Sequence, residues 1–125
     1  MRKRVLIFGT FDGFHTGHQF VVNEAAKKGN ELVAAVARDL HVRALKNKEP
    51  LNDERIRLAR VRENPLVSRA ILCDEELRSY HILDEVQPDV IVLGFDQFEL
   101  QDDLRRWMRE HHREIPIETL PRILV

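Results

Sequence analysis

Hydrophobic residues gather in five short runs that are separated by stretches with helical spacing. The runs are residues 5–8, 32–37, 70–73 and 90–93, and the pair Ile115 and Ile117. Continuous apolar runs, unlike alternating ones, are typical of strands that are buried on both faces of a parallel sheet. We therefore predict a single Rossmann-like α/β domain over residues 1–125, with a mainly parallel five-stranded sheet flanked by helices.

Four stretches between the runs have the features of helices. The first begins at Thr16, carries Gln19 at capping-box spacing and ends before Gly29. Asn52 is the expected N-cap of the second, which the Asn-Pro pair at 64–65 ends. The apolar positions of the third are Leu77, Tyr80, Leu83 and Val86, and those of the fourth are Leu100, Leu104, Trp107, Met108 and His111. Strands thus alternate with helices, and an open sheet of this kind binds ligands outside the carboxyl ends of its strands.

The charges of the chain are balanced, with 20 Lys and Arg against 21 Asp and Glu and a formal net charge of -1. This balance predicts neither a nucleic-acid partner nor a membrane partner. The arginine-rich stretch 105–113 is interleaved with acidic residues, so we expect an ion-paired, solvated surface there. The single cysteine, Cys73, excludes an internal disulfide. We find no secretory signal and no membrane-length apolar run, so we expect a cytoplasmic protein.

The residues best suited to chemistry follow the first predicted strand, in the sequence GTFDGFHTGH at 9–18. Gly9 allows a sharp turn, Gly17 allows close approach of backbone to a ligand, and the next helix directs its positive end there. His15 and His18 are three residues apart, so both imidazoles can donate to the same phosphate. A solvated helix cap or half of a metal site would also fit two such histidines. Sequence patterns of P-loop kinases, dinucleotide-binding dehydrogenases, zincins and nucleophile-elbow hydrolases are absent.

The Gly-Thr-Phe-Asp and His-x-Gly-His elements of this turn resemble the signature of the cytidylyltransferase-like nucleotidyltransferases. The resemblance extends from Val5 to about Leu120. Within it, the segments at 36–39, 42–50 and 88–97 are similar to archaeal FAD synthases in particular. The Leu-Pro-Arg sequence that begins at Leu120 instead resembles glycerol-3-phosphate cytidylyltransferases.

The resemblance implies transfer of a nucleoside monophosphate from a nucleoside triphosphate, with Mg²⁺, to a small phosphate-bearing acceptor, with release of pyrophosphate. It favours an adenylyltransferase that makes FAD from ATP and FMN. A glycerol-3-phosphate cytidylyltransferase and a non-catalytic nucleotide-binding module are the alternatives. By resemblance, His15 and His18 stabilise the triphosphate, while Thr10, Phe11 and Asp12 line the nucleotide and acceptor side. Asp12 is also a candidate to contact the metal or to orient the acceptor.

Further candidates lie outside the turn. Lys46 and Lys48 fall in a polar stretch that we expect to be a loop, where a lysine can close over phosphates; Lys46 is preferred. Arg55 is in the first turn of its predicted helix, an unfavourable position for a cation unless an anion is near, and it matches an arginine that the family uses on phosphates. Gly94 and Asp96 follow a predicted strand, and Asp96 can accept from a ribose hydroxyl or a base amine.

The large hydrophobic residues are expected mainly in the core. Phe95 and Phe98 are able to stack on a base, but core packing is the expectation for each. Trp107 and Met108 lie on the apolar stripe of their helix, so we expect them in the core or at an interface. By resemblance, a homodimer is a further expectation.

Members of the family commonly continue, past the region that resembles residues 120–125, into a segment rich in serine and threonine whose hydroxyls contact the triphosphate. The sequence given shows no such segment, so the expectation is a nucleotidyltransferase domain that lacks it. A shortened active enzyme, a truncated chain and a binding protein with poor turnover are all compatible with this pattern.

Overall fold

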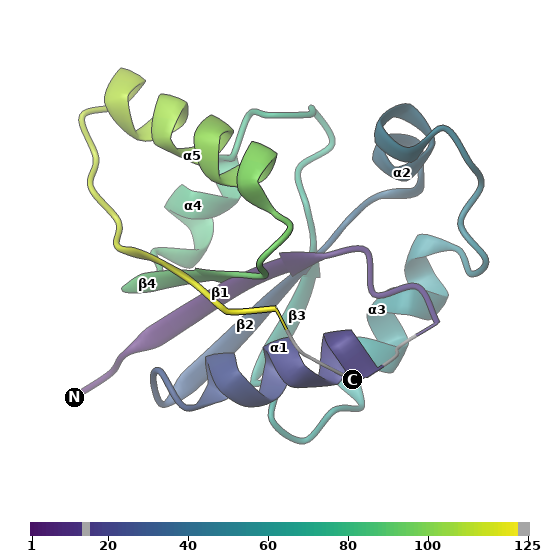
Figure 1. The fold of residues 1–125 in the computed structure, drawn as a ribbon, viewed down its shortest axis with the longest axis horizontal. Helices are drawn as coiled ribbons and strands as arrows, with labels where there is room; N and C mark the ends of the chain where they lie inside the picture. Colours follow the sequence, from purple (N-terminus) through teal and green to yellow (C-terminus); the bar gives the residue numbers. More distant parts are fainter. Residues whose placement is uncertain (14–15, 123–125) are drawn as a thin grey trace.

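The five strands form one parallel sheet in the order β3-β2-β1-β4-β5 in a computed structural model that describes residues 1–13 and 16–122 (Figure 1). The strands are β1 (Arg4–Gly9), β2 (Glu31–Val36), β3 (Arg69–Leu72), β4 (Val90–Leu93) and β5 (Ile117–Thr119). The predicted sheet is therefore confirmed. The last run differs most, because Ile115 packs in the core ahead of the strand and pairing begins at Ile117.

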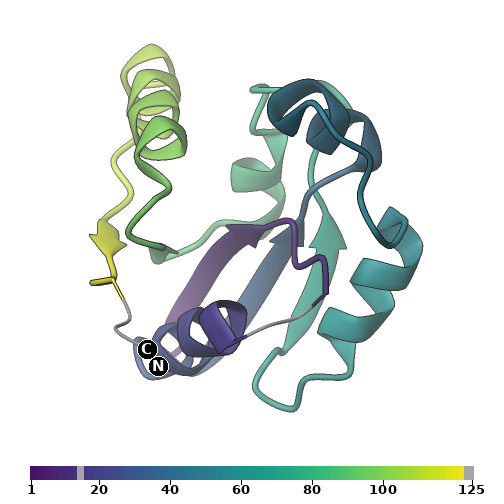
Figure 2. The same ribbon diagram turned by 45° about the vertical axis from the view of Figure 1, so that its right-hand side comes forward.

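Helices cover both faces of the sheet (Figure 2). They are α1 (Thr16–Ala26), α2 (Asp39–Lys46), α3 (Glu54–Arg62), α4 (His81–Val86) and α5 (Phe98–Glu110). Successive residues of β1 point to opposite sides: Val5 packs in the cluster that includes α1 and α3, and Leu6 in the cluster that includes α4 and α5. Both residues are fully buried, which explains why the strand reads as a continuous apolar run. In the part of the chain that the structure describes, no helix is both long and apolar enough to span a membrane.

The helix α2 was not expected from the sequence, and it moves Lys46 out of the predicted loop. Lys46 is the last residue of this helix, and Asn47 ends it in the left-handed conformation with φ 52°. The helix is short and mostly polar, and it buries only His41 and Val42. With eight residues the helix is only about two turns long, which leaves little sequence in which to recognise helical spacing, although the loop itself is present immediately after it.

The cap of α3 also differs from the sequence prediction by one residue. Asp53, not Asn52, is the N-cap, and its carboxylate accepts a hydrogen bond of 2.9 Å from the backbone N–H of Ile56. The side-chain amide of Asn52 is instead 3.1 Å from the carboxylate of Asp12. A contact from a distant turn thus decides which of two adjacent capping residues serves the helix.

The third predicted helix starts later than its apolar spacing suggests. Leu77 and Tyr80 precede α4, which begins at His81. Tyr80 adopts φ 51°, a left-handed conformation that interrupts helical geometry.

The large hydrophobic residues divide between core and surface. Trp107 and Met108 are buried, as expected. Phe95 and Phe98 are 49% and 62% exposed, so the expectation that they pack in the core is wrong. Both lie near the start of α5, at the edge where the sheet ends, and not on its buried stripe.

Removal of the α3 cap is expected to have a modest effect. Asp53→Ala should lower the free energy of unfolding by about 1 kcal/mol, because one backbone donor of the first turn loses its partner. Urea unfolding measures this loss, and Asp53→Asn, which keeps an acceptor, serves as the control. A change of less than about 0.3 kcal/mol in the alanine variant would show that the cap bond is not stabilising.

Candidate active site

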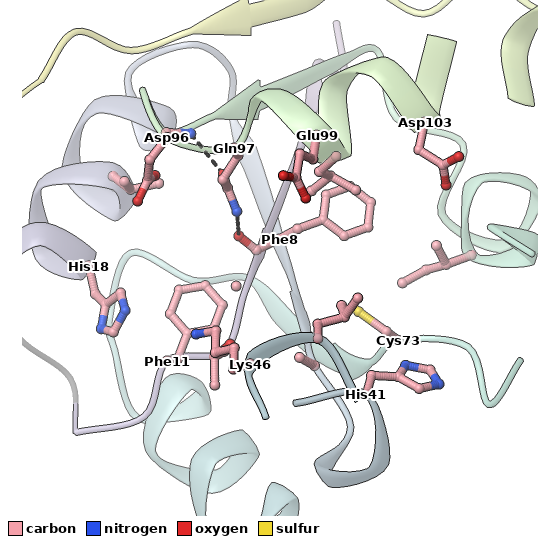
Figure 3. A pocket seen from close by; sticks show the side chains of 18 of the residues that line it. Phe8, Phe11, His18, His41, Lys46, Cys73, Asp96, Gln97, Glu99 and Asp103 are labelled. Carbon is pink, nitrogen blue, oxygen red and sulfur yellow. Dashed lines mark hydrogen bonds between the residues drawn. The ribbon is translucent and has the colours of Figure 1, made fainter. Parts of the chain in front are cut away.

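A cavity of about 640 Å³ lies at the carboxyl ends of the central strands, the edge that the sequence predicted (Figure 3). Its walls come from the turn after β1, from α1 and α2, from the segment after β3, from the turn after β4 and from α5. Eight residues singled out from the sequence line it, namely Gly9, Thr10, Phe11, Gly17, His18, Lys46, Gly94 and Asp96. The topology thus brings together residues that are far apart in the sequence.

The turn after β1 is built around Phe11. Its side chain is buried, its backbone has φ 55°, and its ring folds back over Gly9. A Cβ at Gly9 would lie 2.8 Å from two ring carbons of Phe11, so any other residue there would displace the ring. The ring of His18, on α1, lies 5.4 Å from the Phe11 ring between centroids, and Figure 3 shows the two at one end of the cavity. Phe11 therefore supports the imidazole; His15 lies outside the described residues.

The carboxylate of Asp12 holds a neighbouring loop. It accepts hydrogen bonds from the backbone N–H of Leu51 (2.6 Å), and from the backbone N–H (3.0 Å) and side-chain amide (3.1 Å) of Asn52. Burial acts to raise the pKa of Asp12, but the hydrogen bonds from Leu51 and Asn52 and the charge of Arg57 bring the pKa below its usual value. Asp12 is not among the described residues that line the cavity. The structure thus places it where it fixes the turn to the start of α3.

Arg57 is a buried residue that sequence reasoning missed. Its side chain is fully buried and donates to the carbonyl oxygens of Thr10 (2.8 Å) and Asn52 (3.0 Å), and to the carboxylate of Asp39 (2.7 Å). These partners belong to three different segments. Arg57 therefore fixes the turn after β1 and the start of α2 relative to α3.

The other basic candidates differ in whether they line the cavity. Lys46 lines the cavity from the end of α2. All three side chains are exposed, but Arg55 and Lys48 are not among the described lining residues. The structure does not bring Arg55 to the cavity, so its role on a phosphate stays a prediction.

The turn after β4 is locked to β1 by Gln97, a residue that the sequence reading did not include among the site residues. The Gln97 amide oxygen accepts from the backbone N–H of Gly94 (2.8 Å), and its amide nitrogen donates to the carbonyl of Phe8 (3.0 Å), as the dashed lines in Figure 3 show. This side chain fixes the distance between the ends of β1 and β4. On the rim beside it, Asp96 is exposed, and the guanidinium of Arg122 lies 5.7 Å from the ring centroid of Phe95.

The opposite end of the cavity contains ionisable groups in a different environment. Burial, with a contribution from Asp74, raises the pKa of Cys73 to about 12, so its thiol is protonated at neutral pH and is a poor nucleophile. His41 is buried with its Nε2 2.9 Å from the carbonyl oxygen of Glu75. Because a carbonyl only accepts, this Nε2 carries the hydrogen. The hydroxyl of Tyr80 donates to Asp103 at 2.6 Å.

The cavity is electrically uneven. Figure 3 shows His18, Asp96 and Lys46 toward the end formed by the first turn and Asp103 at the opposite end. Asp74, Glu76, Arg78 and Glu99 also line the cavity. Residues 1–13 and 16–122 contain no group of three or more His, Cys, Asp or Glu side chains arranged to hold a metal ion. An anionic ligand is therefore best accommodated at the His18 end.

Known proteins are similar to this chain over most of its length. A family model described as Cytidylyltransferase-like matches residues 6–121. The chain is 42% identical over 107 residues to a FAD synthase of Methanohalophilus mahii, with 82% of this chain and 73% of that protein covered. It is 45% identical over 94 residues to a FAD synthase of Aciduliprofundum boonei, with 75% of this chain and 62% of that protein covered.

Two solved structures share the fold. The crystal structure described as a lipopolysaccharide core biosynthesis protein from Thermoplasma volcanium has a TM-score of 0.90 and 35% identity, and covers 99% of this chain and 100% of that one. A protein of unknown function from Archaeoglobus fulgidus has a TM-score of 0.76 at 22% identity, with 94% of this chain and 89% of that chain covered. The second likeness concerns the fold alone.

Proposed function

Because this chain belongs to the cytidylyltransferase-like family, we propose that it transfers the adenylyl group of ATP to the phosphate of FMN and so forms FAD. A phosphate oxygen of FMN forms a bond to the α-phosphorus of ATP, the bond from that phosphorus to the bridging oxygen breaks, and pyrophosphate leaves. The observation that carries the proposal is the cavity at the sheet edge, where His18 and Lys46 meet the glycine-containing turn after β1. The relatives named FAD synthases support the choice of acceptor.

The proposed work of the protein is positioning and charge stabilisation. Nucleotidyl transfer needs two phosphates held in line and donors for the charge that develops on the oxygens of the transferred group. His18 is suited to donate there, since its ring is supported by Phe11 at the start of α1, where backbone N–H groups also point outward. Lys46 reaches the same cavity from another helix and supplies a positive charge. His15 remains part of the proposal through its position in the motif.

The turn after β4 is the proposed nucleoside side. Gly94 and Asp96 line the cavity there, and Gln97 fixes the turn to β1. The carboxylate of Asp96 is placed at the rim, where it can accept from a ribose hydroxyl. Phe95 lines the cavity and is 49% exposed, so it offers a ring face on which a base can stack.

Mg²⁺ enters this proposal as part of the substrate, the Mg·ATP complex. Magnesium in such enzymes is commonly held by substrate phosphates with one or two carboxylates and water. The described residues do not form a three-ligand cage, and the Asp12 carboxylate already accepts hydrogen bonds from residues 51 and 52. No resident metal site is assigned to the chain, and no residue is assigned to the ion.

A substrate screen tests the proposal. Each of the four nucleoside triphosphates is incubated with FMN or with glycerol 3-phosphate and Mg²⁺, and both pyrophosphate and the nucleotide product are measured. FAD formed from ATP and FMN supports the proposal. A product from CTP and glycerol 3-phosphate would identify a cytidylyltransferase instead. Nucleotide binding by calorimetry without pyrophosphate from either acceptor would identify a binding module.

The contribution of Lys46 can be tested against its neighbour. Lys46→Ala should lower kcat/KM for ATP about tenfold, because the cavity loses a mobile positive charge near the phosphates. Lys48→Ala removes the same charge from an exposed position in the adjoining loop and should change kcat/KM less than twofold. Equal effects of the two substitutions would show that general surface charge, and not a contact from Lys46, attracts the nucleotide.

A further inference from the structure

The end of the cavity away from His18 is formed largely by residues 76–80, which we call the 76–80 wall. Glu76, Leu77, Arg78 and Tyr80 line the cavity, and Glu99, Leu100 and Asp103 of α5 face it. Figure 3 shows Asp103 on α5 at the opposite end of the cavity from His18. The wall follows β3 and precedes α4, and the backbone N–H of Leu83 in α4 donates to the carbonyl oxygen of Tyr80, the last residue of the wall, at 3.0 Å.

The backbone of the 76–80 wall is unfavourable by itself. Arg78 has φ 69° and Tyr80 has φ 51°, both in the left-handed region that residues with a side chain seldom adopt. Such conformations persist when contacts with the rest of the structure hold them. Local turn bonds link Ser79 only to Glu76, within the wall itself.

Arg106 supplies the contacts that connect the wall to α5. Its Nη2 donates to the carbonyl oxygen of Arg78 at 3.1 Å, and its Nε donates to Asp103 at 2.8 Å. Asp103 in turn accepts a hydrogen bond of 2.6 Å from the hydroxyl of Tyr80. One guanidinium thus holds both left-handed residues, the first directly and the second through Asp103. A further ion pair from Arg106 to Glu110 keeps the side chain against the helix.

The chemistry of this end suits the acceptor better than a triphosphate. The carboxylates of Glu76, Glu99 and Asp103 outnumber the cation Arg78 that lines the cavity with them, and so they disfavour a phosphate chain there. Leu77 and Tyr80 offer apolar surface. For the two reacting phosphates to meet, the nucleoside and the body of the acceptor must extend in different directions from them. With the nucleoside on the turn after β4, the body of the acceptor extends toward the 76–80 wall.

We propose that Arg106 is a positioning residue for the acceptor, because it holds the 76–80 wall in the shape that receives the part of the acceptor distant from its phosphate. This inference rests on the proposed transfer to FMN. Arg106 is not among the described residues that line the cavity, so its effect is exerted through Arg78, Tyr80 and Asp103. Affinity for FMN therefore depends on Arg106, while binding of ATP does not.

Steady-state kinetics with each substrate varied in turn tests the proposal. In Arg106→Ala, KM for FMN should rise about tenfold, with KM for ATP and kcat changed less than twofold. Arg106→Lys should restore part of the affinity, since an ammonium reaches Arg78 or Asp103 but not both in the same geometry. The matched control is Arg105→Ala, an exposed arginine on the same helix, which should leave all three constants unchanged.

Tyr80→Phe keeps the ring in the wall and removes only the hydroxyl that donates a hydrogen bond to Asp103. It should raise KM for FMN severalfold. If Arg106→Ala does not fold, this variant tests the proposal in its place. The inference is overturned if folded Arg106→Ala, or Tyr80→Phe in its place, keeps the wild-type KM for FMN, or if KM for ATP rises equally. A wild-type protein that forms no FAD would instead overturn the proposed function, which separates the two failures.

Discussion

Replacement of His18 by alanine is expected to lower kcat for FAD formation by about 100- to 1,000-fold, the usual cost of losing one donor to a charged transition state. His18 lines the cavity at the start of α1, with its ring packed against Phe11. During transfer, negative charge grows on the oxygens between the α- and β-phosphorus atoms, and an imidazole already held in place stabilises it without reorganisation. The effect should fall on kcat more than on KM for ATP, because the interaction strengthens in the transition state.

The assay for this prediction is release of pyrophosphate under saturating ATP and FMN, with the melting temperature measured in parallel. His18 is partly exposed, so the melting temperature should change little. His81→Ala is the control, since it removes an exposed histidine from the start of α4. If His18→Ala released pyrophosphate at more than half of the wild-type rate, the assignment of His18 to the reaction would be wrong.

The sequence was most informative where chain order alone fixes position. Apolar runs separated by helices predict parallel strands, and parallel strands place the residues after β1 and β4 on one edge. Gly9, Gly17, His18, Gly94 and Asp96 follow this logic, and all of them line the cavity. Their positions needed no knowledge of side-chain packing.

The sequence was least informative where the burial and contacts of a side chain depend on partners that are distant along the chain. Arg57 looks like a surface arginine between polar neighbours, yet it is fully buried, whereas Ile56 beside it is 43% exposed. Its partners Thr10 and Asp39 are 47 and 18 residues away along the chain. No local pattern reports such contacts. Helical position and the family resemblance pointed instead to Arg55, whose role on a phosphate stays a prediction.

Exposure of aromatic residues was also beyond local reasoning. Phe95 and Phe98 are hydrophobic and near a helix start, so burial was the simplest expectation. The stripe of α5 is already filled by Leu104, Trp107 and Met108, which pack on the sheet. The two phenylalanines therefore remain at the cavity rim and beside it, where Phe95 is available to a ligand.

The second large effect concerns Arg57. Arg57→Met should lower the free energy of unfolding by about 3–5 kcal/mol and the melting temperature by about 10 °C or more. Methionine fills much of the same volume, so the loss comes mainly from the uncompensated charge of Asp39 and the carbonyl groups of Thr10 and Asn52 that lose their donor. The control is Arg60→Met, an exposed position on the same helix, which should change stability by less than about 0.5 kcal/mol.

A double-substitution cycle distinguishes this explanation from simple loss of packing. Asp39→Asn removes the charge that Arg57 neutralises, so its combination with Arg57→Met should cost clearly less than the sum of the two single effects. The expected coupling is about 1–3 kcal/mol, since the pair is desolvated and both members contribute to one network. Additive losses in urea unfolding would show that the ion pair is not a coupled unit. In that case Arg57 would stabilise the turn at Thr10 through its backbone hydrogen bonds alone, and the conformation of α2 that carries Lys46 would not depend on it.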